Sequence, residues 1–128
     1  MELVPAGAAS RGNINERALD AIRALNSERG GVLVQKVVNA WVDDTPQRLA
    51  FLRQALAEHD APAVRKVAHS MKSASANVGA ESFARMCRQL EQLGRDASID
   101  GAAGILNEME REFQAVRDSL SAIVEKET

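Results

Sequence analysis

The chain has 128 residues, which is enough for one domain that buries about two thirds of its unfolded surface without a disulfide or a structural metal. It contains 16 Lys and Arg residues and 18 Asp and Glu residues, which gives a net charge of -2. This balance indicates neither the basic surface that binds nucleic acid nor a polybasic membrane patch. No apolar run is long enough to span a membrane and no secretory leader is recognisable, so we expect a cytoplasmic domain without direct membrane contact.

Apolar residues recur at intervals of three and four along most of the chain, a spacing that is typical of amphipathic α-helices. The most regular pattern lies toward the C-terminus and consists of Leu106, Met109, Phe113, Val116, Leu120 and Ile123. No strand-like alternation, hairpin signature or internal repeat competes with it. The sequence therefore predicts an all-α fold.

Caps, glycines and prolines divide this helical sequence into segments. Asn15 is a candidate N-cap of a short first helix whose apolar face includes Leu25, and two glycines at residues 30 and 31 interrupt the chain after it. A second helix is predicted at residues 33–41. Because proline is tolerated best in the first turn of a helix, Pro46 predicts a helix boundary or a kink before a third helix.

Three further helices are predicted after residue 59. Asp60 can cap the first of them, which has Pro62 in its first turn and carries His69. Gly79 is placed where that helix should end, because glycine readily adopts the left-handed conformation of a C-terminal cap. Two more amphipathic helices then occupy the chain up to its C-terminal end.

The number and length of these helices predict the architecture. Four long helices joined by short turns best bury their apolar stripes in an up-down-up-down four-helix bundle. One or two short N-terminal helices are expected to flank it. This bundle is predicted to cover residues 15–128. Residues 1–14 are rich in Ala and Gly and show no apolar period, so we expect a disordered lead-in or an expression remnant.

The helix that carries His69 is predicted to have two contrasting faces. Positions three and four apart are neighbours on a helix, which places four residues on one face. They are His69, Lys72, Ser73 and Ala76. The opposite face is an apolar seam that consists of Val64, Val67, Ala68, Met71, Ala74, Ser75 and Val78. We therefore expect His69 to point outward from a helix whose other side is buried.

The stretch AHSMKSASANVGA at residues 68–80 combines this histidine with a lysine, small side chains and a glycine. It resembles the motif of the histidine-containing phosphotransfer (HPt) domain family, roughly Ala-His-x-x-Lys-Gly-x-x-x-x-hydrophobic-Gly-Ala. Ser73 stands where the family usually has glycine, but it is still small. The segments Trp41–Leu49 and Cys87–Glu91 are also similar to family segments, so the resemblance extends over most of the chain.

The resemblance implies that His69 accepts a phosphoryl group on Nε2 from a receiver-domain aspartate and passes it to another receiver. An imidazole suits this task because its neutral nitrogen is a nucleophile near neutral pH and forms a labile P–N bond. Lys72 would place its ammonium group near the phosphate oxygens and disfavour the imidazolium form of the ring. Ser73 and Ala76 would keep the surface flat enough for the active site of another protein.

Three charged residues near this motif each have two interpretations. Glu91 stands where some relatives carry a glutamine that hydrogen-bonds near the histidine, so it could orient the Nδ1–H of His69 or be solvated surface. Arg65 and Lys66 lie one turn before the histidine. They could dock an acidic receiver surface or be ordinary solvent-facing charges.

The chain contains no Gly-rich phosphate loop, no Walker lysine motif and no carboxylate set for Mg²⁺. We therefore expect no ATP site, cofactor or metal of its own, and predict a phosphocarrier rather than an enzyme. The resemblance implies that Mg²⁺ and the reacting aspartate come from response-regulator receiver domains, with a hybrid sensor histidine kinase as an expected partner. The domain is predicted to be a monomer.

Other functions compete with this hypothesis. The bundle could be a protein-interaction module that regulates a partner, with phosphorylation secondary. A histidine-kinase dimerisation helix pair is disfavoured, because that class usually has an acidic residue directly after its histidine, where this chain has Ser70. A zinc site formed by His59 and His69 is also disfavoured. Cys87 falls on an apolar stripe, which indicates a buried side chain rather than a reactive thiol.

Overall fold

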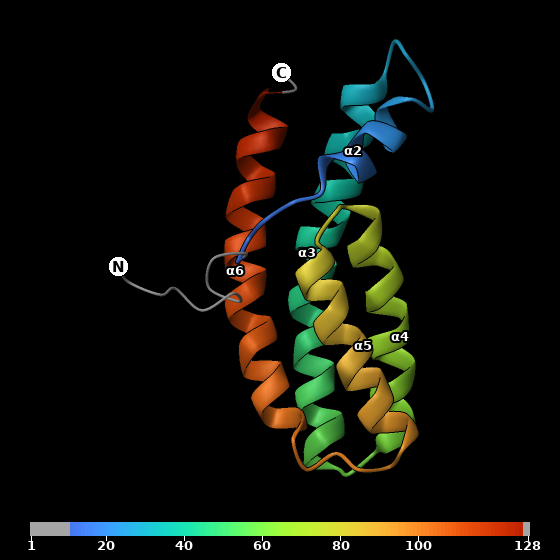
Figure 1. Cartoon of the computed structure of the whole chain (residues 1–128), viewed down its shortest axis with the longest axis vertical. Helices are drawn as coiled ribbons and strands as arrows, with labels where there is room; N and C mark the ends of the chain where they lie inside the picture. The colour runs from blue at the N-terminus through green and yellow to red at the C-terminus, as the bar shows by residue number, and fades with distance from the viewer. Residues whose placement is uncertain (1–10, 127–128) are drawn as a thin grey trace, which may run out of the picture.

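Five α-helices joined by short connections make up most of the described chain (Figure 1). The structure is a computed structural model that describes residues 11–126; residues 1–10 and 127–128 lie outside the described part. The helices are α2 (Glu16–Arg23), α3 (Gly30–Ala57), α4 (Ala61–Asn77), α5 (Glu81–Arg95) and α6 (Ala102–Lys126). No strand occurs among residues 11–126, and the predicted all-α class is confirmed.

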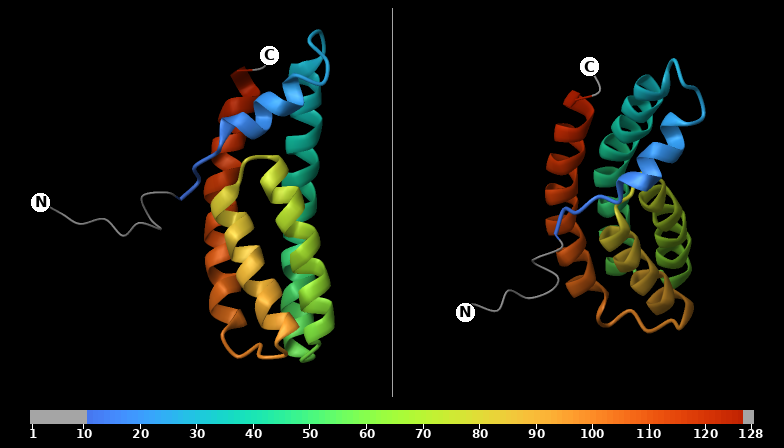
Figure 2. Two further views of the ribbon diagram at one scale, coloured as in Figure 1. Left: turned by 45° about the vertical axis from the view of Figure 1, so that its right-hand side comes forward. Right: turned by 45° about the horizontal axis from the view of Figure 1, so that its top comes forward.

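The bundle consists of α3, α4, α5 and α6, which run alternately down and up, and α2 is the short helix that flanks it (Figure 1). In the bundle, α4 packs against α3 and α5, while α6 packs against the same two helices from the other side. Figure 2 shows that α4 and α5 form a hairpin that is shorter than α3 and α6, and that α2 lies at the turn of this hairpin. The predicted up-down-up-down bundle is therefore confirmed. No described helix is long and apolar enough to cross a membrane.

The helix boundary or kink predicted at Pro46 is not a boundary, because residues 30–57 form one continuous helix, α3. Proline supplies no N–H to the helical hydrogen-bond ladder, which costs about 3 kcal/mol in a helix interior. Packing outweighs this cost, since buried residues continue at helical intervals on both sides of the proline, from Val34 to Ala55. Next to it, the Thr45 hydroxyl donates to the Trp41 carbonyl oxygen at 2.6 Å. The predicted second and third helices are the two halves of α3.

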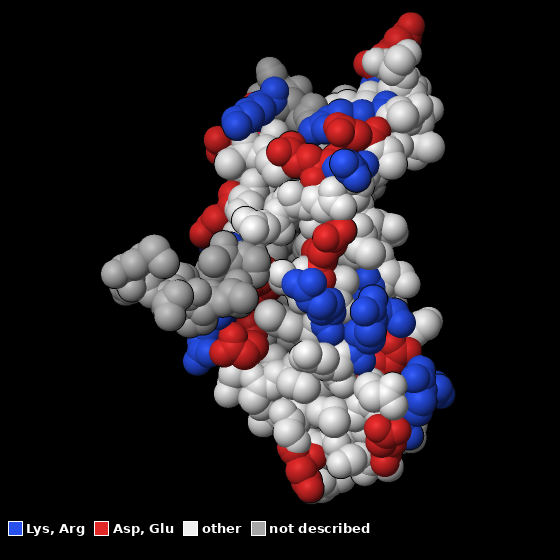
Figure 3. All heavy atoms as spheres, in the orientation of Figure 1, with Lys and Arg blue, Asp and Glu red and all other residues white. Residues whose placement is uncertain are grey.

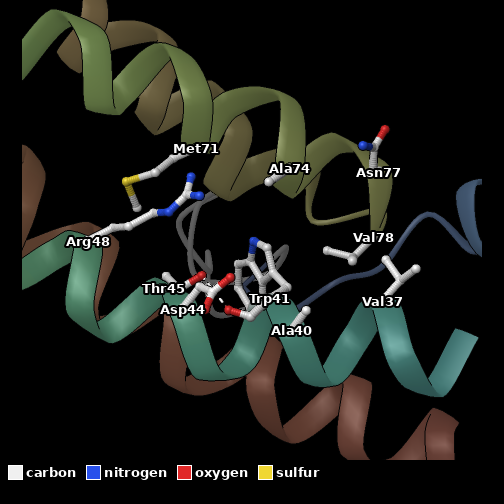
Figure 4. A pocket seen from close by; sticks show the side chains of 10 residues that line it. All are labelled: Val37, Ala40, Trp41, Asp44, Thr45, Arg48, Met71, Ala74, Asn77 and Val78. Atoms are coloured by element: carbon white, nitrogen blue, oxygen red, sulfur yellow. Dashed lines mark hydrogen bonds between the residues drawn. The ribbon is translucent and has the colours of Figure 1, made fainter.

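Trp41 of α3 contacts each of the other three bundle helices. Its indole lies 5.4 Å from the ring of Phe83 on α5, edge-to-face at 83°, and 5.4 Å from the ring of Phe113 on α6. Its Nε1–H donates to Ser75 Oγ on α4 at 3.0 Å. Figure 4 shows the indole between α3 and α4, beside a hollow of about 230 Å³. Trp41 thereby connects the helix that carries His69 to the rest of the core.

The buried side chains follow the predicted apolar stripes. The largest fully buried ones include Leu19, Leu52, Met71, Phe83, Leu90, Leu106, Met109 and Leu120. Cys87 is buried among them as predicted, and burial raises the pKa of its thiol to about 12. The thiol therefore stays protonated near neutral pH and is not a reactive nucleophile.

Both ends of α4 are determined by residues that the sequence identifies. The Asp60 carboxylate accepts from the backbone N–H of Ala63 at 3.1 Å, which confirms the predicted N-cap. Gly79, just after α4, has a φ of 80° in the left-handed region that favours glycine. A Cβ on Gly79 would lie 2.4 Å from the carbonyl oxygen of Asn15, whose own N–H donates to the Gly79 carbonyl at 2.9 Å. The α4–α5 turn is thus hydrogen-bonded to, and packed closely against, the residue that precedes α2.

The first helix is shorter than predicted. The Asn15 side chain accepts from the backbone N–H of Arg17 at 3.1 Å, which confirms the N-cap. The helix ends at Arg23, so Leu25 lies beyond it and is 78% exposed. Its predicted place on the apolar face was wrong, and the buried anchor of this helix is Leu19.

Residues 1–14 were expected to form a disordered lead-in or an expression remnant, and the first ten of them lie outside the described residues. Arg11 forms a salt bridge with Glu108 of α6 at 3.1 Å. The Gly12 N–H donates to the carboxylate of Glu112 at 2.9 Å, and Glu112 is 1% exposed. Residues 11 and 12 are therefore bound to α6.

Replacing the partner of the Trp41 indole tests the connection between α3 and α4. In Ser75→Ala the buried Nε1–H loses its acceptor, so we expect the free energy of unfolding to fall by about 1–3 kcal/mol. Ser73→Ala, an exposed position on the same helix, is the matched control and should stay within about 0.5 kcal/mol of the wild type. Urea denaturation measures both variants, and equal stability of the two would contradict this role of Ser75.

Candidate functional site

His69 lies on the outer face of α4, near the middle of the helix. The buried side of α4 consists of Val64, Ala68, Met71 and Ser75, as the predicted seam requires. Because this seam faces the core, the side chain of His69 is directed outward and is 63% exposed. A second protein can therefore reach the imidazole ring.

Glu91 of α5 is the hydrogen-bond partner of this histidine. Its Oε2 atom lies 2.8 Å from Nδ1 of His69, and its Oε1 atom accepts from Lys72 Nζ at 2.8 Å. Glu91 is only 4% exposed, so the interpretation of this residue as solvated surface was wrong. The sequence contains a signal for its burial, because Glu91 falls between Cys87 and Gly94 at helical spacing, and both of these are buried.

The charge of Glu91 determines which nitrogen of His69 carries a proton. The hydrogen bond from Lys72 is the main cause that holds the pKa of Glu91 below its ordinary value; burial opposes it and the hydrogen bond from His69 adds to it. The carboxylate is therefore ionised near neutral pH and can only accept hydrogen bonds. Nδ1 must then be the protonated nitrogen, and in the neutral ring Nε2 has the free lone pair.

Two cations share the carboxylate with His69. Lys72 was predicted to stand near a phosphate on the histidine, and the structure places its Nζ on the second oxygen of Glu91. Arg95, at the end of α5, approaches Oε2 at 3.2 Å and keeps 54% of its side chain exposed. The sequence reasoning missed Arg95, although it follows Glu91 by four residues, a spacing at which helical side chains meet.

The surroundings of the ring are open and basic. Ser73 and Ala76 are exposed on α4, on the side of the helix that carries His69. A hollow of about 260 Å³ beside the ring is lined by Arg65, Lys66, His69, Glu91 and Arg95. Arg65 and Lys66, the predicted docking residues, are both exposed there.

Positive charge is concentrated on the hairpin of α4 and α5. Residues 61–95 contain six of the 16 Lys and Arg residues but only two of the 18 Asp and Glu residues. The six cations are Arg65, Lys66, Lys72, Arg85, Arg88 and Arg95. Figure 3 shows Lys and Arg side chains gathered over α4 and α5. A chain that is acidic overall thus presents a basic surface around its exposed histidine.

Among residues 11–126 no group of three or more His, Cys, Asp and Glu side chains is placed to hold a metal ion. His59 lies two residues after the end of α3 and has a φ of 55°, and Asp60 beside it caps α4. The chemistry that the described site can supply consists of an oriented nucleophilic nitrogen with cations next to it.

The described bundle thus presents an oriented, solvent-exposed histidine on one of its helices. The family model of the Hpt domain matches residues 36–119, and the chain belongs to this family. The crystal structure of histidine-containing phosphotransfer protein B (HptB) from Pseudomonas aeruginosa PAO1 superposes with a TM-score of 0.78. The two sequences are 31% identical, and the match covers 88% of this chain and 95% of that one. No curated protein matches the chain with significance.

Membership of the Hpt family assigns the chain a phosphotransfer role in a phosphorelay of two-component signalling. Members of this family carry phosphoryl groups rather than act as enzymes in the usual sense. Hpt domains interact with receiver domains in these relays.

Replacing Glu91 should change how the stability of the protein depends on pH. Because the pKa of Glu91 is lowered by folding, its stabilising effect is fully present above the ordinary carboxyl value of 4.5 and is lost as the pH falls through the lower folded value. Glu91→Gln lacks this titration. Between about pH 7 and about pH 3 its free energy of unfolding should therefore fall less than that of the wild type.

The control is Glu28→Gln, which removes the same charge from an exposed position before α3 and should follow the wild-type profile. Denaturant titrations at each pH measure the difference. Parallel profiles for the wild type and Glu91→Gln would contradict the pairing of this carboxylate in the folded protein.

Proposed function

We propose that this protein is a phosphocarrier in a multistep phosphorelay, in which His69 takes a phosphoryl group from a receiver aspartate and donates it to a second receiver. The observation that carries the proposal is the 2.8 Å contact between Nδ1 of the exposed His69 and the buried carboxylate of Glu91. This contact leaves Nε2 as the nitrogen that can react.

The transfer needs no proton movement at the histidine. The Nε2 lone pair forms a bond to phosphorus while the bond from phosphorus to the aspartate oxygen breaks, and the aspartate leaves as a carboxylate. Nδ1 keeps its proton, so the imidazole ring becomes positively charged as the P–N bond forms. The Glu91 carboxylate, already hydrogen-bonded to Nδ1, stabilises this charge. In the second transfer the same steps run in reverse.

Lys72 and Arg95 are the cations that can stabilise the phosphorylated state. In the described structure both are paired with Glu91, at 2.8 and 3.2 Å. A phosphoryl group on His69 adds about two negative charges next to them, so their hydrogen bonds can turn toward its oxygens. Arg95 has more room for this movement, because 54% of its side chain is exposed compared with 27% for Lys72.

The basic surface of the α4–α5 hairpin fits an acidic partner. A receiver domain presents carboxylates around its phosphorylated aspartate, and opposite charges accelerate the encounter of two proteins. Arg65 and Lys66 stand at the edge of the hollow beside His69, where they would contact that surface. Ser73 and Ala76 are small enough to let a partner approach the ring.

The docking surface continues on the other side of α4. A hollow of about 490 Å³ between α3 and α4 shares Lys66 with the hollow at His69. It is also lined by Asp44, Arg48, Val67 and Phe51, and Phe51 is 51% exposed. An exposed aromatic ring in a hollow that Arg48 and Lys66 also line suits an acidic surface that carries an apolar side chain.

The partner would supply what the described residues do not. Mg²⁺ and the reacting aspartate are assigned to the receiver domain, and a hybrid sensor histidine kinase is the proposed origin of the phosphoryl group. The cytoplasmic location and the monomeric state expected from the sequence stay predictions.

Transfer of labelled phosphate tests the proposal. Receiver domains from the same genome, carrying radiolabelled phosphate on their aspartates in the presence of Mg²⁺, should transfer label to the wild-type chain and not to His69→Gln. Because the nucleophile is removed, we expect label uptake to fall by at least about 100-fold. His59→Gln, which changes the other histidine of the chain, is the control and should accept label normally.

Label on His69→Gln, or no transfer from any receiver to the wild type, would contradict the proposal. Binding of a partner without transfer would support the alternative of an interaction module.

The role of Phe51 is tested by the dependence of transfer on receiver concentration. A negative charge in this part of the docking surface should raise the half-saturating receiver concentration of Phe51→Glu about 10-fold, with little change in the maximal rate. Leu25→Glu alters another exposed apolar residue, in the connection between α2 and α3, and should behave as the wild type. Equal saturation curves for the two variants would contradict a role of Phe51 in docking.

A further inference from the structure

Gly94 lies where the backbones of α4 and α5 come very close together. It is buried on α5, and a Cβ added to it would lie 2.8 Å from the backbone N of Arg65 and 3.0 Å from the carbonyl oxygen of Ala61. Ordinary Cβ contacts begin at 3.4 Å. Because both neighbouring atoms belong to the backbone of α4, they cannot swing away as a side chain could. Any side chain at this position would therefore force the two helices apart.

This contact lies about one helical turn from the His69–Glu91 pair. Arg65 precedes His69 by four residues on α4, and Gly94 follows Glu91 by three residues on the antiparallel α5. The spacing of the helices at Gly94 therefore influences the distance between the imidazole and the carboxylate. That distance is 2.8 Å, and a displacement of several tenths of an ångström would take it beyond the usual hydrogen-bond range.

The Glu91 side chain has little freedom to compensate for such a displacement. The residue is 4% exposed, and its two carboxylate oxygens are also held by Lys72 and Arg95. Not every helical glycine of this protein is required for packing, because a Cβ on Gly104 of α6 would meet nothing within 4 Å. Residue 94 has to be small because the backbone of α4 lies so close to it.

We propose that Gly94 is a positioning residue for phosphotransfer. By permitting the close approach of α4 and α5, it brings Glu91 within hydrogen-bond distance of Nδ1 and so keeps the lone pair of His69 on Nε2. This inference rests on the proposed phosphocarrier function.

Gly94→Ala tests it, with Gly104→Ala as the matched control. In Gly94→Ala the rate of label transfer from a phosphorylated receiver should fall about 10-fold, by analogy with the loss seen when the group that orients a metal-binding histidine is replaced. Nitrogen NMR shifts of the imidazole should show a new population protonated at Nε2. Gly104→Ala should keep both the wild-type tautomer and a rate within about twofold of the wild type.

A double-mutant cycle with Glu91→Ala separates positioning from a general loss of packing. If Gly94 acts through Glu91, adding Gly94→Ala to Glu91→Ala should change the transfer rate by less than about twofold. An equal loss in both backgrounds would overturn the proposal, as would an unchanged tautomer and rate in the single variant. The NMR measurement needs no partner, so it also distinguishes this outcome from a failure of the wild type to accept phosphate.

Glu91→Asp provides an independent test if Gly94→Ala does not fold. It shortens the carboxylate arm by one methylene group and leaves the helix contact at Gly94 intact. The same change of tautomer and about the same 10-fold loss of rate are expected. A wild-type tautomer and rate in Glu91→Asp would show that the distance from α5 is not critical and would overturn the inference.

Discussion

A carboxylate that is removed from water has to be paired with cations or hydrogen-bond donors, because burial otherwise disfavours its charge. Glu91 meets this requirement with donors from both helices of the hairpin: His69 and Lys72 on α4, and Arg95 on its own helix α5. Since both of its oxygens are engaged, Glu91 has a defined orientation and imposes one on the imidazole. The orientation of the imidazole and the free lone pair on Nε2 depend on this ion-paired carboxylate and on the spacing of α4 and α5 that permits it.

The rest of the fold supports α4 from within and at both ends. Inside the bundle, Trp41 donates to Ser75 and packs against aromatic rings of α5 and α6. Asp60 caps one end of the helix, and the turn at Gly79 is hydrogen-bonded to Asn15 at the other. A helix held in this way can present a reactive side chain in a defined position.

In the proposed function, the chemistry of phosphoryl transfer is shared between two proteins. The described residues provide an oriented nucleophile, neighbouring cations and a basic surface, but no group of side chains that could hold a metal ion. In the proposed function the remaining groups belong to a receiver domain, so the reaction takes place across a protein interface. The concentration of positive charge on the α4–α5 hairpin of an acidic protein suits rapid and reversible association, which depends more on electrostatic attraction than on buried area.

The sequence by itself determined the all-α class, the caps at Asp60 and Gly79 and the outward direction of His69, because each of these depends on residues that lie within a few positions of one another. The tertiary structure alone decided the continuity of α3 through Pro46 and the burial of Glu91. Local preferences of proline and glutamate predict a helix boundary and a solvated surface. Contacts with helices that are distant in the sequence overrode both preferences, since they supply the apolar packing and the cations that compensate for them.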